Sequence, residues 1–327
     1  MNKSAIPIIA VAIAVACVFT VTVLFAVSNQ KDGGSGKIKA VVTIAPQKEF
    51  VSKVAGEHVL VTVMVPSGKE PHSYEPTAEQ MKAVADADVY FKLGSGIEFE
   101  SIWMDTFVQQ NPKMKVVNCS SGITLIPMEH EHDHNDSDSG CGPVLLNGTR
   151  TTVCIHDYDH HEEHGLDPHV WMSPKNAKIM VENILKTLKS MDSENAGIYQ
   201  KNADAYMLEL DNIIANMTAG LSPYKGSKIL VYHPAFGYLA HDFGLVQIAV
   251  EKNGMEPTPS GLAAVIEQAK KENITVVFAE PQFDRHNADV IASEIGGTVI
   301  MIDALAEHYA DNMKDIAVKL ISALGKT

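Results

Sequence analysis

Histidine, a common metal ligand in proteins, is concentrated in one acidic part of this chain. Eight of the fourteen histidines fall between residues 130 and 169. Two stretches hold them, MEHEHDHNDSDSG (128–140) and HDYDHHEEHGLDPHVW (156–171): His130, His132, His134, His156, His160, His161, His164 and His169. Imidazole and carboxylate groups bind divalent cations. The sequence therefore raises the question of which histidines the fold builds into one site.

Two series of short β-branched runs, separated by amphipathic stretches, predict the framework. Strand, helix and strand at this spacing indicate a parallel sheet with helices on both faces. We expect an α/β fold of two lobes, each with a mainly parallel four-stranded sheet. The expected strands are 37–44, 59–65, 88–94 and 115–119 in the first lobe, and 227–233, 245–250, 275–280 and 297–302 in the second.

A long helical stretch between the two series predicts a rigid connection. Asp192 or Ser193 can cap it, and Gly220 ends it with Pro223 just beyond. We therefore expect an N-terminal lobe over 38–191, which includes a His-rich acidic loop at 129–164. The linking helix covers 192–222, and the C-terminal lobe covers 223–327.

Ligands of open parallel sheets bind beyond the carboxyl ends of the strands. His72 follows the second expected strand, His233 ends the first strand of the second lobe, and Asp303 follows the last strand. His169 ends the His-rich region, just before Ser173-Pro174 open a helix. Three imidazoles and one carboxylate, two from each lobe, would complete a tetrahedral zinc site.

Four stretches, PHSYEPTAEQMKAVADADVYFKLGSGIE, DPHVWMSP, HPAFGYLAHDFGL and FAEPQFD, resemble the solute-binding proteins of zinc and manganese ABC transporters. They occur in that family's order, and the resemblance extends from Lys37 to Leu324. It implies a metal held between two α/β lobes linked by a long helix, and delivery to a membrane permease whose ATPase drives import. The family's ligand positions match His72, His169, His233 and Asp303.

The resemblance also bears on the metal. Members with a carboxylate at the third ligand position are mostly manganese proteins, and members with histidine are mostly zinc proteins. His233 therefore favours Zn²⁺, in agreement with the preference of imidazole for zinc. Mn²⁺, or binding of both metals, stays open as the alternative.

Two carboxylates are candidates for positioning the ligand histidines. Asp167 and Glu280 could each accept a hydrogen bond from the N–H of a ligand histidine and so fix its tautomer. The alternative for Asp167 is a helix cap, and for Glu280 it is an ordinary surface carboxylate.

The seven remaining histidines of 129–164 predict an accessory role. The loop could bind further zinc weakly and pass it to the main site, or it could sense when zinc is plentiful. The alternative is a solvated loop with incidental metal affinity. Cys141 and Cys154 flank a short segment there and could form a disulfide in an oxidising compartment. Cys119, after an expected strand, reads as a buried free thiol.

The N-terminus predicts export. Residues 5–27 carry no charge and are long enough to span a bilayer, with Lys3 before them. For residues 1–28 our first prediction is a signal anchor, our second a cleaved signal peptide and our third lipidation at Cys17. A flexible linker is expected at 29–37. Each places the body outside the cytoplasm, at the cell surface or in the periplasm, and the anchor would tether it to the membrane.

The net charge of −14 argues against a nucleic-acid partner. Four protein ligands leave no open position for a reacting water, so we expect no enzyme. A surface adhesin with structural zinc is a further alternative. We expect a monomer.

Overall fold

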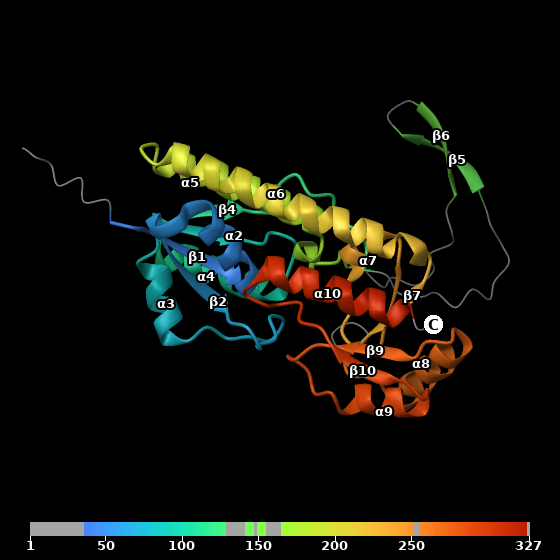
Figure 1. Ribbon diagram of the computed structural model, residues 1–327. Helices are drawn as coiled ribbons and strands as arrows, with labels where there is room; N and C mark the ends of the chain where they lie inside the picture. Colours follow the sequence, from blue (N-terminus) through green and yellow to red (C-terminus); the bar gives the residue numbers. More distant parts are fainter. Residues whose placement is uncertain (1–35, 129–140, 147–148, 155–164, 252–254, 326–327) are drawn as a thin grey trace, which may run out of the picture. The chain divides into compact units, whose positions relative to one another are not determined.

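The framework of the fold is a pair of parallel sheets with four strands in each sheet (Figure 1). We describe a computed structural model over residues 36–128, 141–146, 149–154, 165–251 and 255–325. The first sheet has the order β2-β1-β3-β4 and the second has the order β10-β9-β7-β8. Their strands are β1 (Ile38–Ile44), β2 (Val59–Val65), β3 (Val89–Lys92), β4 (Lys115–Asn118), β7 (Lys228–Val231), β8 (Val246–Ala249), β9 (Val276–Ala279) and β10 (Thr298–Met301).

Both sheets follow one topological scheme. The first strand of each series pairs on one side with the second strand and on the other side with the third, and all of these pairs are parallel. The strand order therefore reverses between β1 and β3 in one sheet and between β7 and β9 in the other. Such a reversal is where open α/β sheets bind ligands. The predicted α/β class and all eight predicted strands are confirmed.

Helices connect the strands and cover the sheets. The strand-connecting helices are α2 (Ala45–Ala55), α3 (Ala78–Ala85), α4 (Glu98–Gln110), α7 (Gly237–Phe243), α8 (Pro259–Lys271) and α9 (His286–Glu294). The three longer helices are α5 (Pro174–Met191), α6 (Ala196–Leu221) and α10 (Tyr309–Leu324). Ser173 caps α5 as predicted, since its side chain accepts a hydrogen bond from the Asn176 N–H at 3.0 Å.

The long helix α6 begins later than the sequence predicted. Asp192 ends α5 instead of opening α6, and its carboxylate accepts hydrogen bonds from the Asn195 amide at 2.7 Å and the Tyr199 hydroxyl at 2.5 Å. α6 packs against α2, α5 and α10. Its buried residues recur every three or four positions, as a helix with one buried face requires: Tyr199, Ala203, Tyr206, Leu210, Ile213, Met217 and Leu221.

One hydrophobic core runs through the first sheet, the three longer helices and one face of the second sheet. The other face of the second sheet packs a separate core with α8 and α9. Strand β9 divides its side chains between them, with Val276 and Phe278 in the first core and Val277 and Ala279 in the second. This period of two is what a strand buried on both faces requires.

A short hairpin lies within the region predicted as an irregular loop. β5 (Cys141–Leu146) and β6 (Thr149–Cys154) pair antiparallel, with Cys141 opposite Cys154. Asn147-Gly148 separates the two strands in the sequence, and this pair strongly favours a two-residue hairpin turn. The prediction of a loop over 129–164 overlooked that signal.

The residues from Ile38 onward form one compact unit. The apolar stretch 5–27 lies outside the described residues, so its predicted role stays a prediction, as do the domain limits. In the described part of the chain, no helix is both long and apolar enough to cross a membrane.

Candidate metal centre

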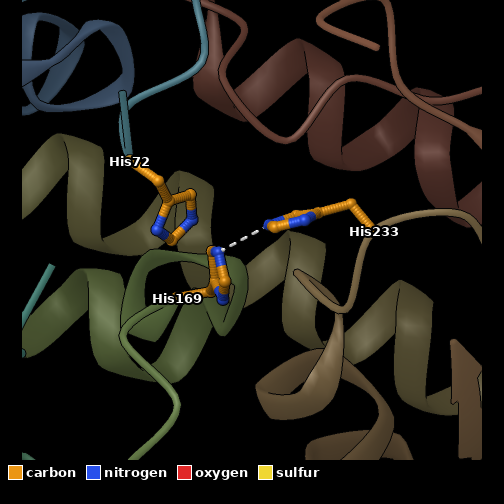
Figure 2. A group of neighbouring side chains, drawn as sticks. All are labelled: His72, His169 and His233. Carbon is orange, nitrogen blue, oxygen red and sulfur yellow. Dashed lines mark hydrogen bonds between the residues drawn. The ribbon is translucent and has the colours of Figure 1, made fainter. Parts of the chain in front are cut away.

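Three of the predicted ligands come together in the structure. One donor atom from each of His72, His169 and His233 lies within 4.8 Å of the others. Their rings face one another in Figure 2, with ring centroids between 5.1 and 5.6 Å apart. His72 lies on the loop after β2, His169 lies before α5, and His233 follows β7. Three segments far apart in the sequence thus converge on one point.

His169 is held by contacts from both halves of the chain. The Ser95 hydroxyl donates to the Pro168 carbonyl at 2.6 Å, and the Tyr238 hydroxyl donates to the Asp167 carbonyl at 3.2 Å. Two residues further on, Trp171 Nε1 donates to the Ala304 carbonyl at 2.7 Å. These bonds fix the backbone on either side of a side chain that is 2% exposed.

His72 is held by its own loop and by α4. The Glu70 carboxylate accepts hydrogen bonds from the His72 N–H at 2.6 Å and the Ser73 N–H at 2.8 Å. Glu98, in the first turn of α4, contacts His72 Nδ1. At 21% side-chain exposure, His72 is the most accessible of the three histidines.

His233 is oriented by the residue that follows β8. Its Nδ1 lies 2.6 Å from Glu251 Oε2, and the Glu251 N–H donates to the Tyr232 carbonyl at 2.9 Å. The ring of Phe283 stacks on the imidazole, with centroids 4.8 Å apart and an interplanar angle of 23°.

The three histidines share one hydrogen-bonding pattern. Each Nδ1 faces a carboxylate: Glu98 for His72, Asp167 for His169 at 2.8 Å, and Glu251 for His233. Because an ionised carboxylate can only accept, this arrangement favours the tautomer that has its hydrogen on Nδ1 and its lone pair on Nε2. Metal-binding histidines are oriented in this way by carboxylates or carbonyls.

The Nε2 atoms are spaced as metal ligands would be. His169 Nε2 and His233 Nε2 lie 3.2 Å apart. Two nitrogens at about 2.0–2.1 Å from a tetrahedral ion are about 3.3–3.4 Å apart. His72 Nε2 is buried and has no hydrogen-bond partner among the described residues. A cation at the meeting point would satisfy all three atoms.

Burial and charge shift the pKa values in opposite directions. Burial lowers the pKa of His233. The hydrogen bond and charge of Glu251 oppose this lowering, and the charges of the neighbouring histidines reinforce it. Burial acts in the same direction on His72, but the hydrogen bond and charge of Glu98, with the charges of Glu70 and Glu251, raise its pKa overall. His72 in turn lowers the pKa of Glu98 against the effect of burial.

The sequence predicted two carboxylates of the second lobe, Asp303 and Glu280, at or beside the metal site. Neither Asp303 nor Glu280 belongs to the group within 4.8 Å. Asp303 Oδ1 accepts hydrogen bonds from Gln282 Nε2 at 2.7 Å and from the Leu305 N–H at 2.8 Å. Glu280 is 1% exposed and lines a cavity together with His169 and His233.

Glu280 does not accept the hydrogen bond that the sequence suggested. Neither of its carboxylate oxygens has a hydrogen-bond partner in the described part of the chain. Its pKa is raised well above the ordinary value, chiefly by burial and further by the charges of Glu251 and Asp303, although nearby backbone N–H groups oppose the shift.

The sequence analysis overlooked Glu98, Glu251 and Glu70. Glu251 directly follows the predicted strand 245–250, so the strand-end rule that selected His233 would have found it as well. Nothing in the sequence singles out Glu98, because tertiary packing brings the start of α4 against the loop that carries His72. The predicted accessory histidines lie outside the described residues: His130, His132, His134, His156, His160, His161 and His164.

Comparison with known families gives one match over most of the chain. The model of the family "Zinc-uptake complex component A periplasmic" matches residues 40–323. The zinc-binding lipoprotein AdcA of Streptococcus pneumoniae (strain ATCC BAA-255 / R6) is 31% identical over 302 residues, which are 89% of this chain and 54% of AdcA. The chain thus spans about half the length of that relative. The high-affinity zinc uptake system protein ZnuA of Bacillus subtilis (strain 168) is 29% identical, over 84% of this chain and 80% of its own.

Solved structures agree with this match. A crystal structure of ZnuA superposes with a TM-score of 0.75 at 32% identity, over 88% of this chain and 99% of that one. A zinc-bound deletion mutant of ZnuA superposes with a TM-score of 0.74, also at 32% identity, over 88% of this chain and 98% of that one.

Proposed function

The chain belongs to the family of periplasmic zinc-uptake component A proteins, and on this premise we propose that it captures Zn²⁺ outside the cytoplasm for import. The ion is cargo, bound reversibly and then handed to an ATP-driven membrane permease. One observation supports this most directly: the buried Nε2 atoms of His169 and His233 face each other at 3.2 Å, and each histidine has its Nδ1 on a carboxylate.

Capture follows from the arrangement of the donors. Each imidazole is already oriented by a carboxylate at its Nδ1, so the protein loses little ordering entropy when the ion arrives. The four carboxylates that contact the histidines attract a cation: Glu70, Glu98, Asp167 and Glu251. His72, the most exposed ligand, is the natural point at which the ion enters and leaves.

Zinc is the metal that this donor set favours. Three imidazoles suit zinc, whereas manganese prefers oxygen ligands, and zinc also binds more tightly than manganese at most sites of nitrogen and oxygen donors. The alternative is manganese, or both metals, at the same site. Competition between the two metals for metal-free protein decides this point.

Reversible capture differs from structural zinc and from catalysis. A carrier stays folded without its ion, whereas a structural zinc site unfolds when the metal is removed. The two hydrophobic cores are built without the three histidines, which supports a folded metal-free form. We propose binding without catalysis, and the absence of metal-dependent ester hydrolysis would agree with this.

The remaining assignments concern the surroundings of the carrier. We propose an ABC permease and its ATPase as partners and a monomeric protein tethered to the membrane through residues 5–27. The His-rich stretch 129–164 is proposed as an accessory zinc binder, and the directly opposed positions of Cys141 and Cys154 support a disulfide between them.

A zinc titration tests the proposal. Purified full-length protein in detergent is stripped of metal, and zinc is titrated against a chromophoric chelator, with manganese in competition. The same titration is repeated on a chain that lacks 129–164. One tight site that survives the deletion supports capture by the three histidines. Loss of all tight binding on deletion would place the principal site in the His-rich stretch and contradict the proposal.

A further inference from the structure

Ser95 is a buried polar residue whose hydrogen bond reaches the backbone of the metal centre. Its side chain belongs to a residue that is 3% exposed, and its hydroxyl donates to the Pro168 carbonyl at 2.6 Å. The same carbonyl accepts a second hydrogen bond, from the Val170 N–H at 2.9 Å. Pro168 lies between Asp167 and His169, whose side chains are bonded to each other at the site. Ser95 therefore holds the backbone that carries a proposed ligand.

The loop that carries Ser95, residues 93–98, has a backbone shape that requires glycine on both sides of the serine. Gly94 has a φ of +75° and Gly96 a φ of +98°, a region that residues with a Cβ rarely adopt. A Cβ on Gly94 would lie 1.9 Å from Asn118 Oδ1, whereas a Cβ on Gly96 would meet nothing within 4 Å among the described residues. The two glycines allow the conformation in which Ser95 contacts a segment 73 positions further along the chain.

The buried network of the first sheet holds this loop in place. The Glu100 carboxylate accepts hydrogen bonds from the Leu93 N–H at 2.5 Å and the Gly94 N–H at 2.9 Å. It also accepts one from the hydroxyl of Thr43, near the end of β1. The Leu93 carbonyl accepts hydrogen bonds from the Ser120 hydroxyl at 2.5 Å and from the Ser120 N–H at 3.0 Å. The start of the loop is thus bonded on both sides to buried parts of the first lobe.

The same loop reaches a second proposed ligand at its other end. Glu98, the last residue of the loop and the first of α4, contacts His72 Nδ1. His233 is oriented separately, by a carboxylate of the second lobe. The loop 93–98 therefore acts on His72 through its ring and on His169 through its backbone, and so it fixes two ligands relative to each other.

On the premise of the proposed function, we propose that the loop 93–98 is a positioning device for the metal centre and that Ser95 is a positioning residue that raises zinc affinity through the backbone of His169. Ser95 does not contact the ion. Its hydrogen bond removes freedom from the segment that carries the ligand, and donors fixed in advance bind an ion with less loss of entropy. Without this bond all the ligands remain present, but one of them is held less firmly.

A pair of serine substitutions tests the hydrogen bond. Ser95→Ala removes the hydroxyl at the Pro168 carbonyl. Ser101→Ala removes the hydroxyl of an exposed serine of α4, which donates to the Ile97 carbonyl one turn earlier at 3.4 Å. Full-length protein in detergent is stripped of metal, and zinc affinity is measured by chelator competition. We expect Ser95→Ala to weaken zinc binding about tenfold and Ser101→Ala to leave it unchanged.

A pair of glycine substitutions separates positioning from stability. Gly96→Ala and Gly226→Ala each place a Cβ at a positive φ, +98° and +80°, where it meets nothing within 4 Å among the described residues. Each therefore strains the backbone to a similar extent. Gly226 lies before β7, at the end of that strand opposite to His233. We expect both variants to lower the unfolding temperature of the metal-free protein alike, and Gly96→Ala alone to weaken zinc binding, by about tenfold or more.

The outcomes distinguish this inference from the function on which it rests. A merely structural role for the loop predicts that zinc affinity follows the unfolding temperature, so equal affinities in the two glycine variants would overturn the inference. Equal affinities in Ser95→Ala and Ser101→Ala would overturn it as well, and this pair decides if Gly96→Ala does not fold. Both results leave zinc capture intact. A wild-type protein with no tight zinc site would refute the proposed function itself.

Discussion

His169 Nε2 and His233 Nε2 lie 3.2 Å apart, although the two residues are 64 positions apart in the sequence. Each ring is turned by a carboxylate on its opposite nitrogen, Asp167 for His169 and Glu251 for His233. Two lone pairs held this close repel each other unless a proton or a metal ion lies between them. The two nitrogens are therefore arranged to hold one positive charge between them.

Removal of His233 should abolish tight zinc binding. His233→Ala takes away one of three nitrogen donors, and we expect zinc affinity to fall by at least about a hundredfold. His241→Ala is the matched control, because that side chain is 69% exposed and lies outside the group of three. Chelator competition measures both variants. Equal zinc affinity in the two proteins would contradict the assignment of His233.

Asp167 should act through His169. Asp167→Asn can donate to Nδ1 as well as accept from it, so it no longer enforces the hydrogen on that nitrogen, and we expect a roughly 10–100-fold loss of zinc affinity. Asp289→Asn, at an exposed pair with Arg285, serves as control. NMR of the imidazole nitrogens reports the tautomer directly. An unchanged tautomer together with unchanged affinity would leave Asp167 with only a structural role.

Zinc affinity should fall with decreasing pH, beginning at His72. Its pKa is raised above 6.5 because the charges of Glu98, Glu70 and Glu251 outweigh burial, so a proton competes with zinc there before it competes at His233, whose pKa is lowered. Below the pKa of His72, one competing proton costs about tenfold in affinity per pH unit. Titrations between about pH 7.5 and 5.5 measure this, across the ordinary imidazole range.

The pair of His72 and Glu98 can be tested separately. In the metal-free protein, the raised pKa of His72 stabilises the fold at pH values below the pKa that His72 has in the unfolded chain. This stabilisation is lost as the pH rises through the pKa that His72 has in the folded protein. The lowered pKa of Glu98 gives stability that is lost as pH falls through its folded value. Because Glu98→Gln removes the charge that raises the pKa of His72, it should shift the loss of zinc affinity to lower pH. An unshifted curve would show that Glu98 does not set the protonation of His72.

Trp171 should couple the stability of the fold to the site. Trp171→Phe leaves the Ala304 carbonyl without its donor at 2.7 Å and removes buried volume two residues from His169. We expect a loss of about 1–3 kcal/mol in the free energy of unfolding and weaker zinc binding. Trp103→Phe, at the other tryptophan, is the control, with denaturant titration as the measurement. Equal losses in both variants would argue against a special role for the contact with Ala304.

Cys141 and Cys154 should be linked by a disulfide. They lie directly opposite each other in the antiparallel pair of β5 and β6, where Cα atoms are about 4.5 or 5.5 Å apart, within the range for a disulfide. In denatured but unreduced protein, we expect alkylation of Cys17 and Cys119 alone, as read by mass spectrometry. Burial raises the pKa of the Cys119 thiol, so in the folded protein it should react slowly. Alkylation of all four cysteines before reduction would exclude the bond.

Local sequence determined the elements and the places where ligands could be. The β-branched runs predicted all eight strands of the two sheets, because a strand buried on both faces must be apolar along its length. The strand-end rule selected His72 and His233, and DPHVW selected His169, since these features depend on neighbours in the chain. The start of α6 was predicted too early, at Asp192 or Ser193, and the β5–β6 hairpin was missed although Asn147-Gly148 was a local signal for it.

Tertiary structure decided which atoms meet. The contacts of His72 with Glu98 and of His233 with Glu251 join residues 26 and 18 positions apart, and hydrophobic periodicity predicts neither. The difference between Glu280 and Asp303 is likewise a matter of strand order. Both follow strands of the second sheet, but only β9 lies next to β7, so only Glu280 lies level with His233. Strand order is set by packing across the whole core, so the pattern along the chain does not determine it.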